Sequence, residues 1–222
     1  MAVWTISSDE GSGGDEVARA LAARVGVPLL DAETIASAVR SEMGAEGRVG
    51  RRVASWLCDC VLSIPPVFGL VPPVSREWSP PPSRRELTER LILEAARSSC
   101  VVAYCTAFAV LAEHPGACHV RIRAPFDWRV RRHARENCLS RETSRKLLLR
   151  VDRKRAAYVR RVYGNRLNRF ESFTVVCDSS RFGLDDLIDV LLIAGGASER
   201  ANSQNAVVVG GLTKWQLGAP LL

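Results

Sequence analysis

The first forty residues alternate between short apolar runs and amphipathic segments. The run Val3-Trp4-Thr5-Ile6 is rich in β-forming residues and predicts a buried strand. From 15 to 25 apolar residues recur at helical spacing, which predicts an amphipathic helix ended by Gly26. The segment 27–30 then predicts a short buried strand, and Asp31 is well placed to cap a second helix.

The rest of the chain continues this alternation of strands and helices. Because such alternation favours parallel pairing, we expect a mostly parallel sheet with helices on both faces. The expected strands are 100–104, 118–122 and 173–177, and the expected helices are 50–62, 83–95, 106–113, 126–163 with a break near Leu139-Ser140, and 183–194.

The length of 222 residues suits one α/β domain with insertions. We place this domain at 1–195, with a proline-rich loop or flap at 63–82 where no regular helix or central strand can cross. A basic, mostly helical region follows at 126–164. The segment 196–222 is rich in Gly, Ser, Asn and Ala, and we expect a flexible or partner-dependent tail there.

Composition changes this picture mainly through charge. The hydrophobic fraction of 47% and the charged fraction of 25% are ordinary for a globular protein and argue against overall disorder. Thirty-one Lys and Arg against 24 Asp and Glu give a net charge of +7, which favours anionic partners. The arginines crowd between 121 and 169, where a solvated helical face would account for part of the excess.

The seven cysteines mostly lie inside apolar runs, which is typical of reduced, buried thiols. Cys58 and Cys60 are one residue apart and have no histidine pair nearby, so we expect no metal site. The N-terminus lacks the pattern of a signal peptide, and no apolar run reaches membrane-spanning length. We therefore expect a cytoplasmic protein without a membrane partner.

A glycine-rich turn joins the first expected strand to the first expected helix. In such a turn, backbone N–H groups at a helix N-terminus can surround a phosphate, and the glycines allow the anion to approach closely. A purely structural turn remains the alternative. The residues we expect to bind a phosphate are Gly11, Ser12, Gly13 and Gly14.

The turn departs from the P-loop pattern G-x-x-x-x-G-K-[ST] at the positions that carry charge. Ser8 takes the place of the first glycine, Gly14 that of the lysine and Asp15 that of the hydroxyl residue. A glycine cannot neutralise phosphate charge, and a carboxylate could at best replace the hydroxyl on magnesium. Asp15 and Glu16 also place negative charge where a polyphosphate would lie.

Several separated blocks carry a family resemblance. The opening combines Trp4-Thr5-Ile6-Ser7 with Glu10-Gly11-Ser12-Gly13-Gly14-Asp15-Glu16-Val17-Ala18. Over most of residues 3 to 194 the chain resembles the cytidylate kinase-like family, whose members also lack the ordinary P-loop lysine. The further blocks that match in order are 27–31, 119–125, 129–132, 152–164 and 175–181.

The resemblance implies a nucleoside monophosphate kinase fold, which is a three-layer P-loop NTPase-like sheet with a helical, arginine-rich lid. It also implies ATP and Mg²⁺ as cofactors if the protein is active. Arg153, Arg160 and Arg161 would then be catalytic lid residues, and Asp31, Arg129 and Arg132 would bind the substrate. Without a ligand, the same residues would form an exposed basic helix and a simple helix cap.

Two departures from the family remove positive charge. Asp15 stands where relatives usually carry an arginine, and Tyr104-Cys105-Thr106 replaces a Gly-Arg-Gly turn. Neither Cys nor Thr can imitate a bidentate arginine, so these losses favour a degenerate enzyme.

Three functions are therefore weighed. The first is ATP-dependent phosphorylation of CMP or a related small molecule. The alternative is a catalytically degenerate kinase-fold protein that acts as a nucleotide-binding, regulatory or protein-interaction module, with a protein partner or a homodimer. Nucleic-acid binding ranks last, because aromatic stacking candidates are few in the basic region; they are Trp128, Tyr158, Tyr163 and Phe170.

Overall fold

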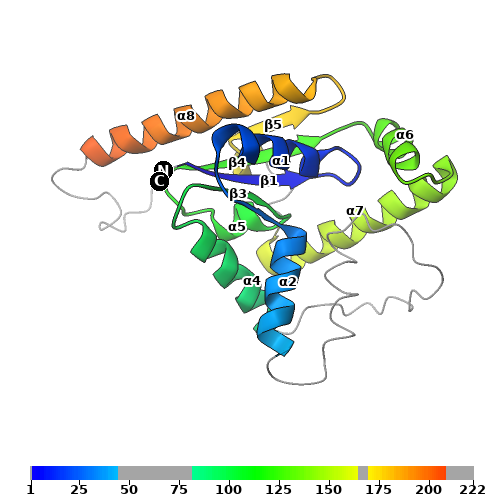
Figure 1. The fold of residues 1–222 in the computed structure, drawn as a ribbon, viewed down its shortest axis with the longest axis horizontal. Helices are drawn as coiled ribbons and strands as arrows, with labels where there is room; N and C mark the ends of the chain where they lie inside the picture. Colours follow the sequence, from blue (N-terminus) through cyan, green and yellow to red (C-terminus); the bar gives the residue numbers. More distant parts are fainter. Residues whose placement is uncertain (1, 45–81, 165–169, 209–222) are drawn as a thin grey trace, which may run out of the picture.

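Five parallel strands form the centre of the fold (Figure 1). The computed structural model describes residues 2–44, 82–164 and 170–208. The strand order β2-β3-β1-β4-β5 places the first strand in the middle, where Thr5 lies opposite Val102 and His119. The predicted α/β class with a parallel sheet is confirmed. The strands are β1 (Val3–Ser8), β2 (Leu29–Asp31), β3 (Cys100–Ala103), β4 (Ala117–Arg123) and β5 (Val175–Asp178).

Helices cover both faces of this sheet (Figure 1). Among the described residues, α1 and α8 lie on one face, and α2, α4, α5 and α7 lie toward the other. The helices are α1 (Gly14–Val25), α2 (Ala32–Gly44), α4 (Pro82–Ala95), α5 (Ala107–Val110), α6 (Phe126–Glu136), α7 (Arg141–Tyr163) and α8 (Leu184–Val208), with a short 3₁₀ turn η2 (Phe170–Ser172).

The sheet separates two hydrophobic cores. Ile6 packs with Leu21 of α1 and Leu191 of α8 on one side. Val3 packs with Ile35 of α2 and Ile92 of α4 on the other. Because β1 is buried on both faces, Val3, Trp4 and Ile6 are apolar and the buried Thr5 hydroxyl is hydrogen-bonded to His119, as expected for the centre of a parallel sheet.

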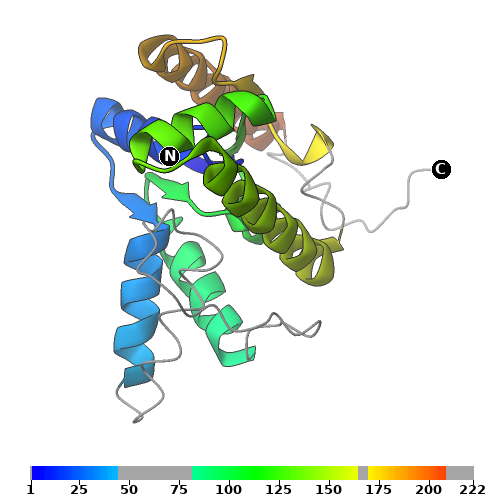
Figure 2. The same ribbon diagram turned by 90° about the vertical axis from the view of Figure 1, so that its right-hand side faces the viewer.

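The basic region consists of two helices, α6 and α7, joined at the predicted break (Figure 2). Cys138 adopts a left-handed φ of 53°, and the Ser140 hydroxyl accepts a hydrogen bond of 3.1 Å from the Thr143 N–H. Ser140 is thus the N-cap that starts α7. The far end of α7 is tied to α4, because the Tyr163 hydroxyl donates to Glu89 at 2.6 Å.

Two helix predictions had wrong boundaries. The helix expected at 106–113 is only the single turn α5, and the helix expected to end at residue 194 continues to Val208. The first part of the expected tail is therefore helical. The helix expected at 50–62 and the proline-rich loop lie outside the described residues, except for Pro82, with which α4 begins.

Two adjacent glycines explain how α8 continues past the predicted end. A Cβ at Gly195 would lie only 2.5 Å from the Trp4 indole nitrogen, so this glycine lets α8 pack closely on β1. A Cβ at Gly196 would meet nothing closer than 3.4 Å, at the end of the flexible Arg200 side chain. Tertiary packing thus overrides the low helix propensity of this pair.

These glycines give a matched prediction. Gly195→Ala is expected to lower the free energy of unfolding by about 1 to 3 kcal/mol, because the added methyl group collides with Trp4. Gly196→Ala is expected to raise it by up to about 1 kcal/mol through helix propensity. Urea denaturation followed by circular dichroism measures both, and equal effects of the two changes would contradict the packing described for Trp4.

Candidate functional site

The glycine-rich turn between β1 and α1 is held from beneath by serine side chains. Gly11 and Gly13 have φ angles of 76° and 82°, a left-handed conformation that favours glycine. The Ser12 hydroxyl is fully buried and donates to the Asp9 carbonyl at 2.6 Å, and the Ser179 hydroxyl donates to the Ser12 carbonyl at 2.6 Å. The turn is therefore a preformed element of the fold.

The N-terminus of α1 opens directly from this turn. Its N-cap residue is Gly13, and no side chain caps the helix. Gly14 passes so close to Ser8 that a Cβ there would lie 2.2 Å from the Ser8 Cβ. The helix thus presents its first N–H groups without a capping side chain, which is the arrangement that binds anions at helix N-termini.

A cavity of about 520 Å³ lies over the turn, within the size range of small-molecule sites. It is bounded by the carboxyl ends of β1 and β3 and by the hinge between α6 and α7. Ligands in parallel α/β sheets bind at this edge. The lining residues are Ile6, Ser8, Asp9, Glu10, Gly11, Gly13, Gly14, Asp15, Glu16, Arg19, Ala103, Tyr104, Cys105, Arg132, Glu136, Asn137 and Arg155.

Arg132 of α6 reaches over the turn. Its guanidinium is so near Gly13 that a Cβ on this glycine would lie 2.6 Å from the Arg132 Nη1. The same guanidinium pairs with Glu16 at 2.6 Å and with Glu136 at 2.7 Å. A cation therefore stands next to the turn although the P-loop lysine is absent.

Arg155 of α7 supplies a second cation and is buried beside the turn. Its Nη1 donates to the Ser8 carbonyl, and its Nη2 donates to a Glu10 carboxylate oxygen at 3.1 Å. Both members of this pair have side chains less than a tenth exposed. Arg155 also lies close enough to act electrostatically on Cys105, which follows β3.

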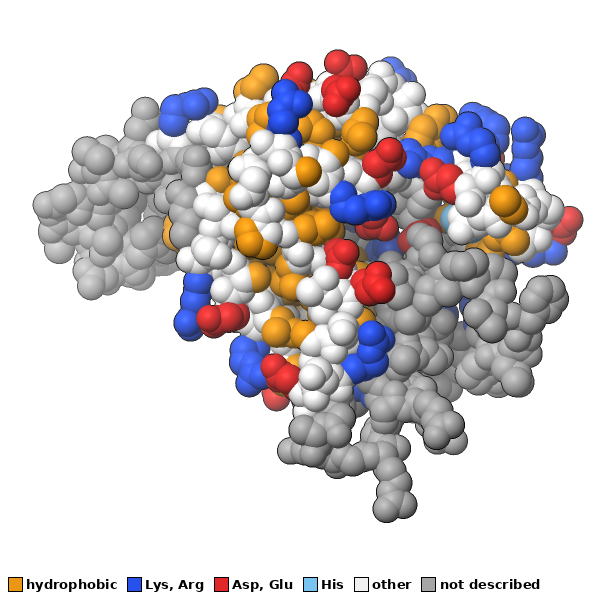
Figure 3. All heavy atoms as spheres, in the orientation of Figure 1, with side chains coloured by type: hydrophobic (Ala, Val, Ile, Leu, Met, Phe, Trp, Pro, Cys, Tyr) orange, Lys and Arg blue, Asp and Glu red, His pale blue; other side chains and the backbone are white. Residues whose placement is uncertain are grey.

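Carboxylates outnumber guanidinium groups in the cavity lining. Five acidic residues face three arginines. Burial, with the negative charge of Glu10, raises the pKa of Asp15 above its ordinary value. On the face shown in Figure 3, acidic and basic side chains are likewise interspersed. A bound anion would thus lie near both positive and negative side chains. A bound cation would offset the negative charge that surrounds Asp15.

The four residues predicted to bind a phosphate do not all line the cavity. Gly11, Gly13 and Gly14 line the cavity, whereas Ser12 lies beneath the turn. Asp31 caps α2 by accepting from the Thr34 N–H at 2.8 Å. It lines a neighbouring cavity of about 320 Å³ that shares Asp15, Arg19 and Ala103 with the first.

The predicted arginines are also divided. Arg132 lines the cavity, but Arg129 is buried behind the turn and donates to the Glu10 carbonyl at 2.9 Å. Arg153, Arg160 and Arg161 have exposed side chains and do not line it. Their catalytic role stays a prediction, and the structure brings Arg155 to the turn instead.

Helical spacing is the signal that would have identified Arg155. It lies seven residues after Leu148 and four before Val159, so the three share the buried face of α7. The exposed arginines fall on the other faces of the same helix. Asp9 was also missed, and it lines the cavity while pairing with Arg121.

His119 does not line the cavity. Its Nδ1 lies 2.8 Å from the Thr5 hydroxyl, and burial lowers its pKa to about 4. The residue is therefore a neutral, packed side chain near pH 7. Among the described residues, no group of three or more His, Cys, Asp or Glu side chains is arranged to hold a metal ion.

The lowered pKa of His119 predicts a pH dependence of stability. The unfolded state takes up a proton near pH 6.5 and the folded state only near pH 4, so stability should fall as pH drops through this window. The contribution is up to about 3 kcal/mol. Urea denaturation at a series of pH values should show the decline in the wild type and a flatter profile in His119→Asn; identical profiles would contradict the assignment.

The parallel sheet, the glycine-rich turn and the two basic helices α6 and α7 form a fold of the P-loop kinase type. The chain belongs to the cytidylate kinase-like family, whose sequence description matches residues 3–181. This confirms the family resemblance. No curated protein matches the sequence. None of the described helices is long and apolar enough to cross a membrane.

Several solved structures have a similar fold. An uncharacterized protein from Eubacterium ventriosum ATCC 27560 superposes with a TM-score of 0.64 at 14% identity, covering 86% of this chain and 96% of that one. A gluconokinase from Sinorhizobium meliloti 1021 gives 0.53 at 14% identity, with 91% and 97% covered. TT1252 from Thermus thermophilus gives 0.51 at 21% identity, with 88% and 96% covered. At these identities the likeness concerns the fold alone.

Proposed function

We propose that this protein is an ATP-dependent phosphotransferase that acts on CMP or a related small molecule. The observation that carries the proposal is the convergence of Arg132 and Arg155 on a turn whose helix N-terminus has no side-chain cap. Arg132 comes from α6 and Arg155 from α7, so both stand on the helices of the lid. They supply positive charge where the lysine of the P-loop is missing.

A divalent cation fits the acidic side of the cavity. The negative charge of nearby Glu10 contributes to the raised pKa of Asp15, and Asp15 occupies the hydroxyl position of the P-loop pattern. Carboxylate oxygens are the protein ligands that Mg²⁺ prefers. Bound Mg²⁺ would offset negative charge on a polyphosphate and on these carboxylates. We therefore expect the affinity for ATP to be much higher with Mg²⁺ than without it.

A phosphate acceptor suits the residues that face the cavity. In the proposed reaction an acceptor phosphate oxygen bonds to the γ-phosphorus of ATP, and the bond to the β,γ-bridging oxygen breaks to release ADP. An ionised phosphate oxygen has no proton to lose, so the step needs no general base. This is consistent with a lining that contains no histidine. The work left to the protein is positioning and charge stabilisation.

Phosphorus NMR of the protein with ATP, Mg²⁺ and a panel of nucleoside monophosphates tests the proposal. We expect diphosphate product with at least one acceptor. Arg132→Gln should lower the rate at least about a hundredfold, because an arginine that stabilises transferring phosphate is worth that much or more. Arg135→Gln, exposed on the same helix α6 as Arg132 and not part of the cavity lining, is the matched control and should leave the rate unchanged.

The second candidate is a non-catalytic nucleotide-binding or regulatory module. The pairing of Arg155 with Glu10 and of Arg132 with Glu16 favours it, because both cations already have partners within the chain. Under this alternative no acceptor is phosphorylated. A large upward shift of the melting temperature with Mg²⁺ and ATP, without turnover, would indicate a binding module, whereas no shift would indicate that nucleotide is not the ligand.

A further inference from the structure

A groove runs along α6, the helix that faces the viewer in Figure 2. Its volume is about 480 Å³, and it reaches the first residue of α7. Of its lining residues only Arg132 also lines the cavity over the glycine-rich turn, so the groove is a separate feature. Apart from Ala134, the lining consists of Trp128, Arg131, Arg132, Arg135, Leu139 and Arg141.

The charges in this groove are all positive. Among the described residues that line it there are four arginines and no carboxylate. Arg132 pairs with the two glutamates named above. Arg131, Arg135 and Arg141 are exposed, and none of these three side chains forms an ion pair or a hydrogen bond with another described residue. Within the described part of the chain, three guanidinium groups of the groove are therefore left without a partner.

The positions of these three arginines are electrostatically unfavourable. Arg131 and Arg135 are four residues apart on α6, so two like charges lie on neighbouring turns of the same face. Arg141 is the first residue of α7, where the helix dipole already presents partial positive charge. A bound anionic chain would offset both repulsions, because its charged groups can reach all three arginines at once.

Aromatic and apolar side chains share the groove with the arginines. Trp128 and Leu139 are both half-buried, and the Arg132 guanidinium carbon lies 5.6 Å from the centre of the Trp128 ring. The sequence interpretation ranked nucleic acid last because aromatic residues are few, but the structure places one of them among unpaired arginines. A base can stack on an indole ring, and guanidinium groups match the geometry of phosphate. This combination fits a nucleic-acid strand better than an acidic polypeptide, which has no base to stack.

We propose that the groove on α6 binds a single-stranded nucleic acid, with phosphates at Arg131, Arg135 and Arg141 and one base against Trp128. Arg131 and Arg135 are one helical turn apart, about 6 Å along α6, so one flexible strand can pair with both. The contacts are with phosphates and with the face of a base, so the groove accepts many base sequences. The proposal does not depend on phosphoryl transfer, because only Arg132 is common to the groove and the cavity over the turn.

Fluorescence anisotropy of a labelled oligouridylate of about eight nucleotides, titrated with the whole protein, tests the proposal. We expect saturable binding. Three phosphate contacts predict that the logarithm of the binding constant falls with the logarithm of the salt concentration with a slope of about −2. Polyglutamate of the same length should compete at least about tenfold more weakly, because it offers no base to Trp128. Equal affinity for polyglutamate would overturn the proposal in favour of an acidic protein partner.

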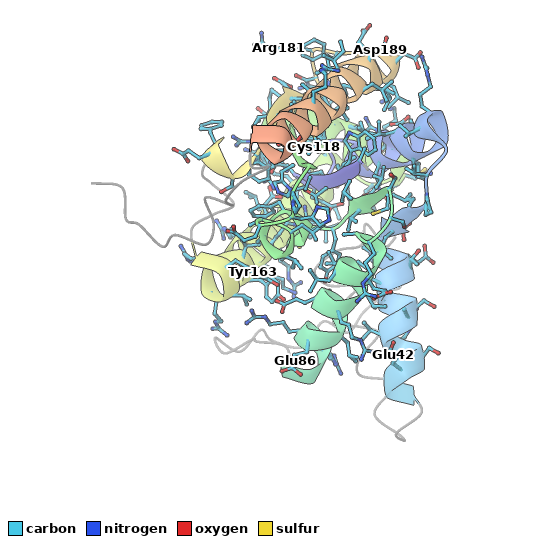
Figure 4. All side chains as sticks on the ribbon, turned by 90° about the vertical axis from the view of Figure 1, so that its left-hand side faces the viewer. Glu42, Glu86, Cys118, Tyr163, Arg181 and Asp189 are labelled. Atoms are coloured by element: carbon cyan, nitrogen blue, oxygen red, sulfur yellow. The ribbon has the colours of Figure 1, made fainter. Side chains whose placement is uncertain are left out.

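Two double variants locate the binding. Arg131→Gln with Arg135→Gln should weaken binding at least about tenfold and make the salt slope shallower by about 1.4, because two phosphate contacts are lost. Arg90→Gln with Arg97→Gln is the matched control, which removes the same charge from two exposed arginines. Arg90 pairs with Glu42, at the end of α2 that is far from the sheet (Figure 4). Equal weakening by both double variants, or no binding to the wild type, would overturn the proposal.

Trp128→Leu tests the stacked base separately. Binding should weaken at least about fivefold while the salt slope stays at its wild-type value, because stacking is lost and no charge is removed. An unchanged affinity would show that the groove binds phosphates alone, and this would overturn the preference for a single strand.

Discussion

Replacing Arg155 with glutamine is expected to lower the free energy of unfolding by about 3 to 5 kcal/mol, because the change removes the buried positive charge that pairs with the Glu10 carboxylate. The loss also removes the bond to the Ser8 carbonyl, so the glycine-rich turn should loosen. Urea denaturation measures the effect on stability. Hydrogen exchange of the backbone N–H groups of the turn measures the effect on the site.

Two further variants separate charge pairing from general damage to α7. Arg153→Gln, on the exposed face of the same helix, should change stability by no more than about 0.5 kcal/mol. Adding Glu10→Gln to Arg155→Gln should recover part of the loss, since the buried negative charge that Arg155 offsets is then also removed. A cost for Arg155→Gln no larger than that of Arg153→Gln would show that the Glu10 pair does not support the turn.

A lysine at position 14, where the P-loop pattern has one, is expected to be tolerated by the fold only if Ser8 is changed as well. Gly14→Lys alone should destabilise the protein by about 1 to 3 kcal/mol, because a Cβ at residue 14 would lie 2.2 Å from the Ser8 Cβ. Ser8→Gly with Gly14→Lys removes that collision and recreates both the first glycine and the lysine of the pattern.

The double variant should also bind Mg²⁺ and ATP at least about tenfold more tightly than the wild type, because a hydrogen bond to a charged phosphate is gained. Isothermal titration calorimetry measures this affinity. Ser8→Gly alone is the control and should leave ATP affinity close to the wild-type value. Equal stability of Gly14→Lys and the double variant would refute the steric coupling of these two positions.

The sheet and most helices were predictable because their signals are local. Apolar runs marked the strands, and Ser140 followed the predicted break in the basic region as a helix cap. The true end of α8 was not predictable, because Gly195 and Gly196 have low helix propensity and the contact with Trp4 is made across the fold. Local helix propensity does not predict the end of a helix when packing between distant segments sets it.

The site was predictable in its main-chain part and less so in its side chains. The glycine pattern located the turn, but the number of arginines in the basic region did not show which of them lies beside it. Arg155 shares a helical face with Leu148 and Val159, and this periodicity was present in the sequence. The Asp9–Arg121 pair joins the residue that follows β1 to a residue of β4, so no sequence spacing could have indicated it.

The affinity of Mg²⁺ and ATP for the wild type and for Arg132→Gln, measured by titration calorimetry, tests the central claim most directly. If lid arginines replace the missing lysine beside the uncapped helix, the wild type binds with one-site stoichiometry at the turn. The variant should then bind at least about tenfold more weakly. Unchanged affinity in Arg132→Gln, or no binding to the wild type, would contradict the account.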